Sequence, residues 1–230
     1  MRDAVKDFIE NIFINMVIPE PIYEFGACQY SEEYEGIKIF FPSKEYFGCD
    51  ITPGRGVDKV LDLHNIEMPD NSIGSIIAVD TMEHVKYPHK AIDEIYRVLK
   101  DDGLVLITSV MDYEIHGAPN DYWRFTPDGF NVLLEKFPIK FVFYSGYDNF
   151  PSSVIIIASK SRNINMANLE MKINDWKEKW KEEKYDQYIL QSRIHFLEEQ
   201  VESYKRKTKE NIFGKVKNEY NRFLNRNNKC

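Results

Sequence analysis

Glycine and proline almost disappear from the chain after Pro151: between that residue and Cys230, Gly214 is the only residue of either type. Before Pro151, turn residues separate short apolar runs at the spacing of a fold that alternates strands with helices. The chain therefore predicts a domain over residues 1–160 and a helical tail over residues 161–230.

The first part of the chain predicts an α/β fold with a mainly parallel sheet. The run 75–80 is continuously apolar, as expected for a parallel strand covered on both faces. Apolar residues in 88–100 share one helical face, and Asp102 and Gly103 are expected to end that helix. Two closing runs predict an antiparallel hairpin at the sheet edge. The predicted strands are 22–25, 45–50, 57–63, 75–80, 104–110, 140–145 and 153–159, and the predicted helices are 2–17, 88–100 and 127–136.

Composition and charge narrow the class of protein. The three cysteines form no C-x-x-C pair, which argues against a disulfide framework and a cysteine zinc site. No apolar run reaches the about 20 residues of a membrane span, and acids interrupt the apolar N-terminus, so we expect a cytoplasmic protein without a secretory signal. Residues 1–202 hold 21 basic and 35 acidic side chains, a poor match for nucleic acid.

Four acidic residues, Glu24, Asp50, Asp62 and Asp80, come at or near the ends of predicted strands. The carboxyl ends of parallel strands meet at one edge of a sheet, which is where α/β folds bind ligands. Carboxylates accept hydrogen bonds, so these acids suit a ligand with hydroxyl and amino groups better than a phosphate, which needs donors and positive charge. The alternative is that each acid is a solvated turn residue; four acids in register favour the ligand.

The order of motifs from Ile22 to Phe137 resembles the class I S-adenosylmethionine-dependent methyltransferases, particularly their small-molecule branch. The most specific stretch is DLHNIEMPDNSIGSIIAVDTMEHVKYPHKAIDEIYRVLKDDGLVLITSV (62–110), and HGAPNDYWRFTP (116–127) looks like the substrate-side segment of a bacterial subgroup associated with surface-glycan assembly. The resemblance implies a Rossmann-like fold, S-adenosylmethionine as the cofactor, and a glycan or other small-molecule acceptor.

The resemblance also implies residues that contact the cofactor. Glu24 and Gly26 correspond to the acid and the first glycine of the loop after the first strand, near the methionine part of the cofactor. Asp50 corresponds to the acid that accepts hydrogen bonds from both ribose hydroxyls.

Five further residues follow in the same way. Asp62 corresponds to the acid that accepts from the adenine amine, with the Leu63 amide next to the ring. Asp80 lies where the fourth strand reaches the amino group of the cofactor, and Glu83 and His84 follow near the sulfonium.

The loop after the first strand departs from the family pattern. It reads EFGACQY where the family has E-x-G-x-G-x-G, so Cys28 and Tyr30 occupy the later glycine positions. The turn 51–56 is also too short for the usual intervening helix. Because the later acids are intact, we expect the loop to take another path around the cofactor.

The segment after the fifth predicted strand holds the candidate catalytic residues. Methyl transfer to a hydroxyl requires alignment of the acceptor and removal of its proton. His116 is the predicted general base, and Asp121 would orient or assist it. Tyr122, Trp123 and Arg124 offer stacking faces and a cation to a sugar or an anionic group. The alternative is a folded lid in which the aromatic residues are core and Arg124 pairs with Asp121.

The histidines do not predict a metal site. His64, His84 and His89 lack ligand spacing on one element, and the motif H-x-x-E-H is absent.

A heptad pattern runs through the tail from Leu169 to Tyr204, with a polar interruption at Glu183 and Gln187. This pattern predicts a coiled coil that joins two copies of the chain as a homodimer. The alternative is one amphipathic helix that packs on the sheet. The apolar positions of the pattern are Leu169, Ile173, Trp176, Trp180, Leu190, Ile194, Leu197, Val201 and Tyr204.

The end of the chain, residues 203–230, carries nine basic and two acidic side chains around an apolar helical face. Such a segment suits an anionic membrane surface, here the inner face of the membrane, or an acidic partner. A solvated, frayed terminus is the alternative.

Two functions of different classes follow. The first is an S-adenosylmethionine-dependent methyltransferase that acts on oxygen of a sugar or another small polar acceptor. The second is a catalytically inactive domain of the same descent, kept as a scaffold that its coiled coil tethers to an assembly.

Overall fold

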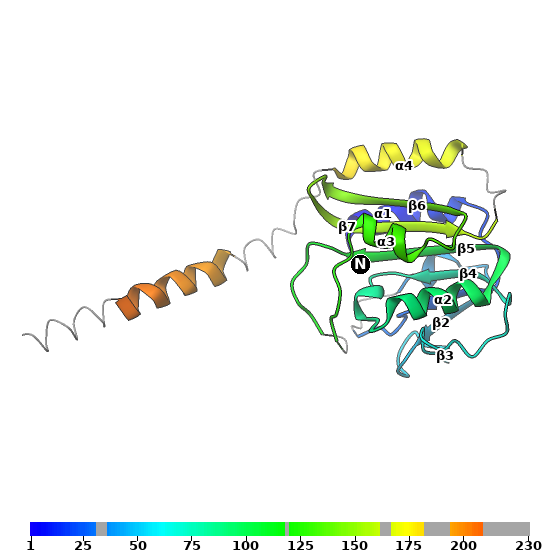
Figure 1. The fold of residues 1–230 in the computed structure, drawn as a ribbon, viewed down its shortest axis with the longest axis horizontal. Helices are drawn as coiled ribbons and strands as arrows, with labels where there is room; N and C mark the ends of the chain where they lie inside the picture. Colours follow the sequence, from blue (N-terminus) through cyan, green and yellow to red (C-terminus); the bar gives the residue numbers. More distant parts are fainter. Residues whose placement is uncertain (31–35, 118–119, 162–166, 182–193, 209–230) are drawn as a thin grey trace, which may run out of the picture. The chain divides into compact units, whose positions relative to one another are not determined.

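The computed structural model describes residues 1–30, 36–117, 120–161, 167–181 and 194–208 (Figure 1). The chain divides into two compact units, Met1–Glu183 and Lys184–Cys230. In the second unit, the described residues 194–208 are helical. None of the helices in the described ranges is both long enough and apolar enough to cross a membrane.

Seven strands in the described part of the first unit form one sheet in the order β3-β2-β1-β4-β5-β7-β6. Strands β3, β2, β1, β4 and β5 are parallel, and β7 runs antiparallel to both β5 and β6. The predicted mainly parallel sheet with an antiparallel edge hairpin is confirmed. The bounds are β1 Ile22–Phe25, β2 Tyr46–Asp50, β3 Lys59–Val60, β4 Ile73–Ala78, β5 Leu99–Val110, β6 Ile139–Tyr147 and β7 Phe150–Ser159.

Four α-helices and three short 3₁₀ helices accompany the sheet in the described part of the first unit. Pro88 begins α2 and Pro127 begins α3, in both cases at the first turn, where proline lacks no hydrogen bond that the helix needs. The α-helices are α1 Asp3–Asn11, α2 Pro88–Val98, α3 Pro127–Leu133 and α4 Ala167–Trp180, and the 3₁₀ helices are η1 Phe13–Asn15, η2 Lys38–Phe40 and η3 Met82–His84.

Two predicted boundaries are wrong. The strand expected over 57–63 is reduced to the two residues of β3. Helix α2 ends at Val98, and Leu99 already pairs with Ile73 of β4, so Asp102 and Gly103 lie inside β5 rather than between helix and strand. Leu99 is fully buried, and its burial in the sheet outweighs the helical pattern that continues to residue 100.

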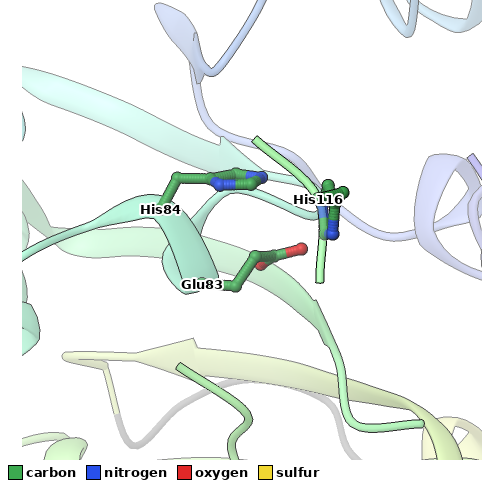
Figure 2. Close-up of side chains that lie close together, drawn as sticks. All are labelled: Glu83, His84 and His116. Carbon is green, nitrogen blue, oxygen red and sulfur yellow. The ribbon is translucent and has the colours of Figure 1, made fainter. Parts of the chain in front are cut away.

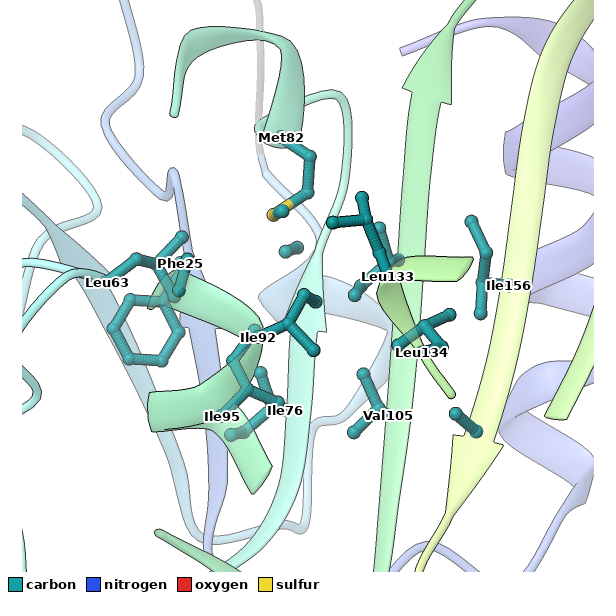
Figure 3. Packing of buried hydrophobic residues seen from close by; sticks show 14 of the residues in the cluster. Phe25, Leu63, Ile76, Met82, Ile92, Ile95, Val105, Leu133, Leu134 and Ile156 are labelled. Atoms are coloured by element: carbon teal, nitrogen blue, oxygen red, sulfur yellow. The ribbon is translucent and has the colours of Figure 1, made fainter. Parts of the chain in front are cut away.

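The apolar core has one layer on each face of the sheet. On one face, α2 and α3 pack through side chains such as Ile92, Ile95 and Leu133 against Ile76 and Val105 of the strands (Figure 3). On the other face, buried residues of α1 and α4 pack against a different set of strand residues. The two layers hold the sheet in place, and therefore also position the carboxyl ends of its parallel strands.

Helix α4 belongs to this core, as Figure 1 shows by its position along β6. Leu169, Ile173 and Trp176 are each at most 6% exposed and pack with α1 and the sheet. The first half of the predicted coiled-coil seam is therefore buried against the domain itself, and the compact unit extends to Glu183, beyond the boundary predicted at residue 160. Residues 183, 187 and 190 of the pattern lie outside the described residues, whereas Ile194, Leu197, Val201 and Tyr204 are described and exposed.

Candidate cofactor and acceptor site

A cavity of about 1000 Å³ opens at the carboxyl ends of the parallel strands. Its walls come from the segments that follow β1, β2, β3 and β4, from residues 84–86, and from the segment after β5. Seven of the predicted site residues line it: Gly26, Asp50, Asp62, Leu63, Asp80, His84 and Tyr122. Residues distant in sequence therefore meet where the sheet topology predicted a ligand.

Gly26 has a positive φ of 82° immediately after β1, a conformation that favours glycine. A Cβ atom at this position would lie 2.3 Å from Oγ1 of Thr81. That hydroxyl donates to the carbonyl oxygens of Phe25 and Val79, so the contact cannot relax by a free rotation. The predicted role of Gly26 as a point of close backbone approach is consistent with this geometry.

Asp50 ends β2, and its carboxylate organises the departing loop. Oδ1 accepts from the backbone N–H and the hydroxyl of Thr52, each at 3.1 Å. Oδ2 accepts from the Cys28 N–H at 3.3 Å, which ties the loop after β1 to the end of β2. Cys28 and Tyr30, which replace family glycines, line the cavity.

Asp62 and Leu63 form the wall next to β3. The Leu63 side chain is buried, and Asp62 Oδ1 accepts from the backbone and ring N–H groups of His64 at 2.8 and 2.7 Å. The Tyr87 N–H donates to Nε2 of His64, so the His64 proton is on Nδ1. Burial raises the pKa of Asp62, but the two hydrogen bonds from His64 outweigh this and hold it below the usual value.

Asp80 lies two residues beyond β4, with a positive φ of 46°. Its N–H donates to the carbonyl and hydroxyl oxygens of Thr108 in β5, and its Oδ1 accepts from that hydroxyl at 2.8 Å. The hydrogen bonds with Thr108 therefore hold Asp80 in an unusual backbone conformation, in which Asp80 lines the cavity.

Glu24 does not line the cavity. It lies in the middle of β1, 6% exposed, and Oε2 accepts from the Tyr46 hydroxyl at 2.8 Å. Burial raises the pKa of Glu24 to about 7, against smaller opposing effects of Tyr46 and Lys38. Successive strand residues point to opposite faces, and Phe25 packs with α2, so Glu24 points to the other face. The structure therefore places Glu24 outside the site to which the resemblance assigned it.

Glu83, His84 and His116 come together beside the cavity (Figure 2). Glu83 and His84 are neighbours in η3, and His116 belongs to the segment after β5. The two imidazole rings meet edge to face, with centroids 4.8 Å apart. Glu83 is fully buried; its Oε2 accepts from the Ser109 hydroxyl at 2.8 Å, and its Oε1 has no hydrogen-bond partner in the described part of the chain. Burial, together with the nearby Asp80, raises the pKa of Glu83.

Asp121 and Arg124 form an ion pair that shapes the segment after β5. The Asp121 side chain is 3% exposed and accepts from both terminal nitrogens of Arg124 and from the His116 N–H. Arg124 also donates to the carbonyl oxygens of Tyr113 and Glu114. The Arg124 guanidinium, followed by the His116 hydrogen bond, holds the pKa of Asp121 well below its usual range despite burial. The arrangement matches the folded-lid alternative for this pair.

The two aromatic residues before Arg124 differ in their surroundings. Tyr122 is 43% exposed and lines the cavity. Trp123 is similarly exposed, and its Nε1 donates to the carbonyl oxygen of Val85 at 2.9 Å. The backbone N–H groups of Tyr122 and Trp123 also donate to the carbonyl oxygen of Glu83 in η3. These hydrogen bonds attach the lid to η3 and to Val85, the residue that follows it.

Several residues around the site were not predicted from the sequence. Thr52 and Thr108 each donate to a carboxylate that lines the cavity, and Ser109 donates to Glu83 beside it. Arg2 donates to the hydroxyls of Ser152 and Ser153 near the ring of Tyr113. The spacing of these residues carries no motif; only the pairing of β4 with β5 and the position of α1 bring them to the site.

Residues 30–107 match the sequence profile of a family described as a methyltransferase domain. The structure is similar to an S-adenosylmethionine-dependent methyltransferase from Archaeoglobus fulgidus, at 13% identity over 69% of this chain and 94% of that chain, with a TM-score of 0.51. It is also similar to the CMeT domain of the citrinin polyketide synthase, at 16% identity over 62% of this chain and 47% of that chain, with a TM-score of 0.50. No curated protein matches the chain.

At these identities the structural likeness shows the fold, which is the Rossmann-like fold of such methyltransferases. The domain match and the fold together indicate S-adenosylmethionine as the cofactor. The cavity fits it: hydrogen-bond acceptors at Asp50, Asp62 and Asp80 face a ligand rich in hydroxyl and amino groups, and the close approach of Gly26 to Thr81 leaves no room for a side chain.

Proposed function

We propose that this protein is an S-adenosylmethionine-dependent methyltransferase that methylates an oxygen of a sugar or another small polar acceptor. The observation that supports the proposal most directly is the cavity that Asp50, Asp62 and Asp80 line at or just beyond the carboxyl ends of β2, β3 and β4. When bound, S-adenosylmethionine supplies an electrophilic methyl group, which leaves sulfur as an acceptor oxygen takes it up.

Each carboxylate has a proposed role in holding the cofactor. Asp50 would accept from the ribose hydroxyls, Asp62 from the adenine amine and Asp80 from the amino group. The buried side chain of Leu63 would pack against the adenine ring, and Gly26 would allow close approach of the backbone.

We propose His116 as the general base for the acceptor hydroxyl. Its Nδ1 lies 3.1 Å from the Glu114 carbonyl oxygen and 3.2 Å from Oδ2 of Asp121. Both partners can only accept, so the proton of neutral His116 is held on Nδ1 and Nε2 is left to take the proton of the hydroxyl. Asp121 would orient the ring, and Arg124 would position Asp121.

Tyr122 and Trp123 are proposed to contact the acceptor. Both residues are more than two-fifths exposed, and Tyr122 lines the cavity. Exposed aromatic faces suit the apolar face of a sugar ring. Arg124 is committed to Asp121 and to two carbonyl oxygens, so its proposed part is structural.

The test is methyl transfer to a panel of monosaccharides and nucleotide sugars, followed by release of S-adenosylhomocysteine. With an acceptor found, His116→Ala should lower kcat by about 10²–10⁴ and leave cofactor affinity near the wild-type value. His89→Ala, on the exposed surface of α2, is the matched control and should behave as wild type. A kcat of His116→Ala equal to that of wild type would show that His116 is not the general base.

The second candidate function is a scaffold that has lost the cofactor. It is favoured by one observation: Cys28 and Tyr30 line the cavity at positions where the family has glycine. A scaffold would bind neither S-adenosylmethionine nor S-adenosylhomocysteine, so a binding measurement separates the two functions without knowledge of the acceptor.

For the tail, we propose self-association through the exposed face of residues 194–208, and contact of residues 203–230 with an anionic membrane surface or an acidic partner. Most of the basic segment, residues 209–230, lies outside the described residues. Light scattering of the full chain and of a chain ending at residue 183 tests the first part; vesicle sedimentation with and without anionic lipid tests the second.

A further inference from the structure

We propose that Glu83, His84 and His116 bind a divalent transition-metal ion at the acceptor side of the cavity. One possible ligand atom from each residue lies within 4.8 Å of the other two (Figure 2). The sequence predicted no metal, because no two histidines have ligand spacing on one element. The fold supplies the constellation instead, by bringing the segment after β5 over η3.

His84 is held in the orientation of a metal ligand. Its Nδ1 lies 2.6 Å from the carbonyl oxygen of Asn120. A carbonyl oxygen only accepts, so Nδ1 of neutral His84 carries the proton and Nε2 keeps its lone pair. Metal-binding histidines usually donate their other ring N–H to a carbonyl or carboxylate oxygen in this way.

His116 shows the same pattern on the opposite side of the cluster. Its Nδ1 faces the Glu114 carbonyl oxygen and Oδ2 of Asp121. Asp121 is in turn fixed by Arg124, which keeps it an acceptor. The ring of His116 is thus fixed by a carboxylate, and its Nε2 is the atom left to bind an ion.

Glu83 supplies an independent observation that favours a cation at this cluster. Its side chain is fully buried, Oε2 is satisfied by Ser109, and Oε1 has no hydrogen-bond partner among the residues that the structure describes. Buried carboxylate oxygens without a partner are unfavourable and rare. Figure 2 shows the carboxylate directed toward the two imidazoles, where a cation would satisfy it.

Two imidazoles and one carboxylate are a ligand set of zinc and other transition-metal sites that keep open positions for substrate. This role rests on the proposed function. An ion here would lower the pKa of an acceptor hydroxyl bound to it, so that the hydroxyl proton passes to solvent water. With the ion bound, His116 would be a ligand, and the role of general base proposed above for its Nε2 would apply only to the metal-free protein. Methyl transfer itself would be unchanged.

The experiment is a calorimetric titration of the full chain, stripped with a chelator and dialysed, with Zn²⁺ alone. We expect one ion per chain, with an affinity in the micromolar range or tighter. His84→Ala and His116→Ala should each weaken binding by about tenfold or more, as should Glu83→Gln, which keeps the size of the side chain. The control variant His89→Ala should bind as wild type does.

Titration with Co²⁺ distinguishes specific from unspecific binding, because the visible absorption of bound Co²⁺ depends on its ligands. The absorption should appear in wild type and in His89→Ala and be lost in His84→Ala, with circular dichroism showing that each variant is folded. Absence of binding at millimolar Zn²⁺ overturns the proposal, as does binding that survives in folded His84→Ala and His116→Ala.

Binding of S-adenosylhomocysteine to the metal-free protein separates this proposal from the proposed function. If the nucleoside binds and Zn²⁺ does not, the metal site is overturned and the methyltransferase stands. If Zn²⁺ binds at these residues and the nucleoside does not, the metal site stands and the methyltransferase is overturned.

Discussion

Replacing Trp176 by alanine should destabilise the Met1–Glu183 unit by about 3–5 kcal/mol, the usual loss for a large buried aromatic side chain. The indole is 3% exposed and meets the rings of Phe8 and Phe143 edge-on, with centroid distances of 5.7 and 5.5 Å. Each such pair contributes about 0.5–1.5 kcal/mol beyond burial. Nε1 also donates to the Ala4 carbonyl oxygen at 3.1 Å, and the variant loses this buried hydrogen bond.

The assay is urea unfolding of the full chain, followed by near-ultraviolet circular dichroism. Tyr204→Ala is the control, because Tyr204 is an aromatic residue of the same heptad pattern but is 69% exposed; its change should stay within about 0.5 kcal/mol. If Trp176→Ala costs less than about 1 kcal/mol, α4 does not belong to the core, and the domain boundary predicted at residue 160 is the better description.

Three further outcomes are expected. The pKa of Glu24 is about 7 in the folded protein, against an ordinary value of 4.5. Glu24 therefore binds its proton more tightly when folded, and the free energy of unfolding should fall as the pH rises from 4.5 to 7, by up to about 3 kcal/mol. Glu24→Gln should remove this loss; equal pH profiles of Tm from pH 5 to 8 for the variant and wild type would contradict it. Gly26→Ala should cost at least about 1 kcal/mol in urea unfolding and abolish nucleoside binding, since its Cβ meets Thr81; unchanged binding would refute the close approach. A chain ending at residue 183 should fold, whereas one ending at residue 164 should not; folding of the shorter chain, seen by near-ultraviolet circular dichroism, would remove α4 from the core.

The sheet was predictable because its strands are short apolar runs whose burial on both faces leaves little choice of structure. The run 75–80 illustrates this: β4 is fully buried from Ile73 to Ala78. The position of Glu24 was equally accessible, since strand alternation puts it on the face opposite Phe25; the resemblance to a family motif overrode that periodicity.

The tail shows what a periodic pattern leaves open. Spacing of three and four residues specifies an apolar stripe on a helix, and the same stripe suits a second helix or the face of a sheet. Leu169, Ile173 and Trp176 fit either a coiled coil or a helix packed on the sheet. The tertiary structure decides for the sheet, because these residues pack beside α1. The cluster at Glu83 and His116 was beyond sequence reasoning for a related reason, because two segments meet there through the sheet and not through local spacing.

The central claim is that the cavity holds S-adenosylmethionine, and calorimetric titration of the full chain with S-adenosylhomocysteine tests it most directly. We expect one site with a micromolar dissociation constant. Asp50→Ala should weaken it by about 1.5–3 kcal/mol, typical of lost charge-assisted hydrogen bonds, while Asp102→Ala on the exposed part of β5 leaves it unchanged. Absence of binding at millimolar ligand, or wild-type affinity in Asp50→Ala, would contradict the account.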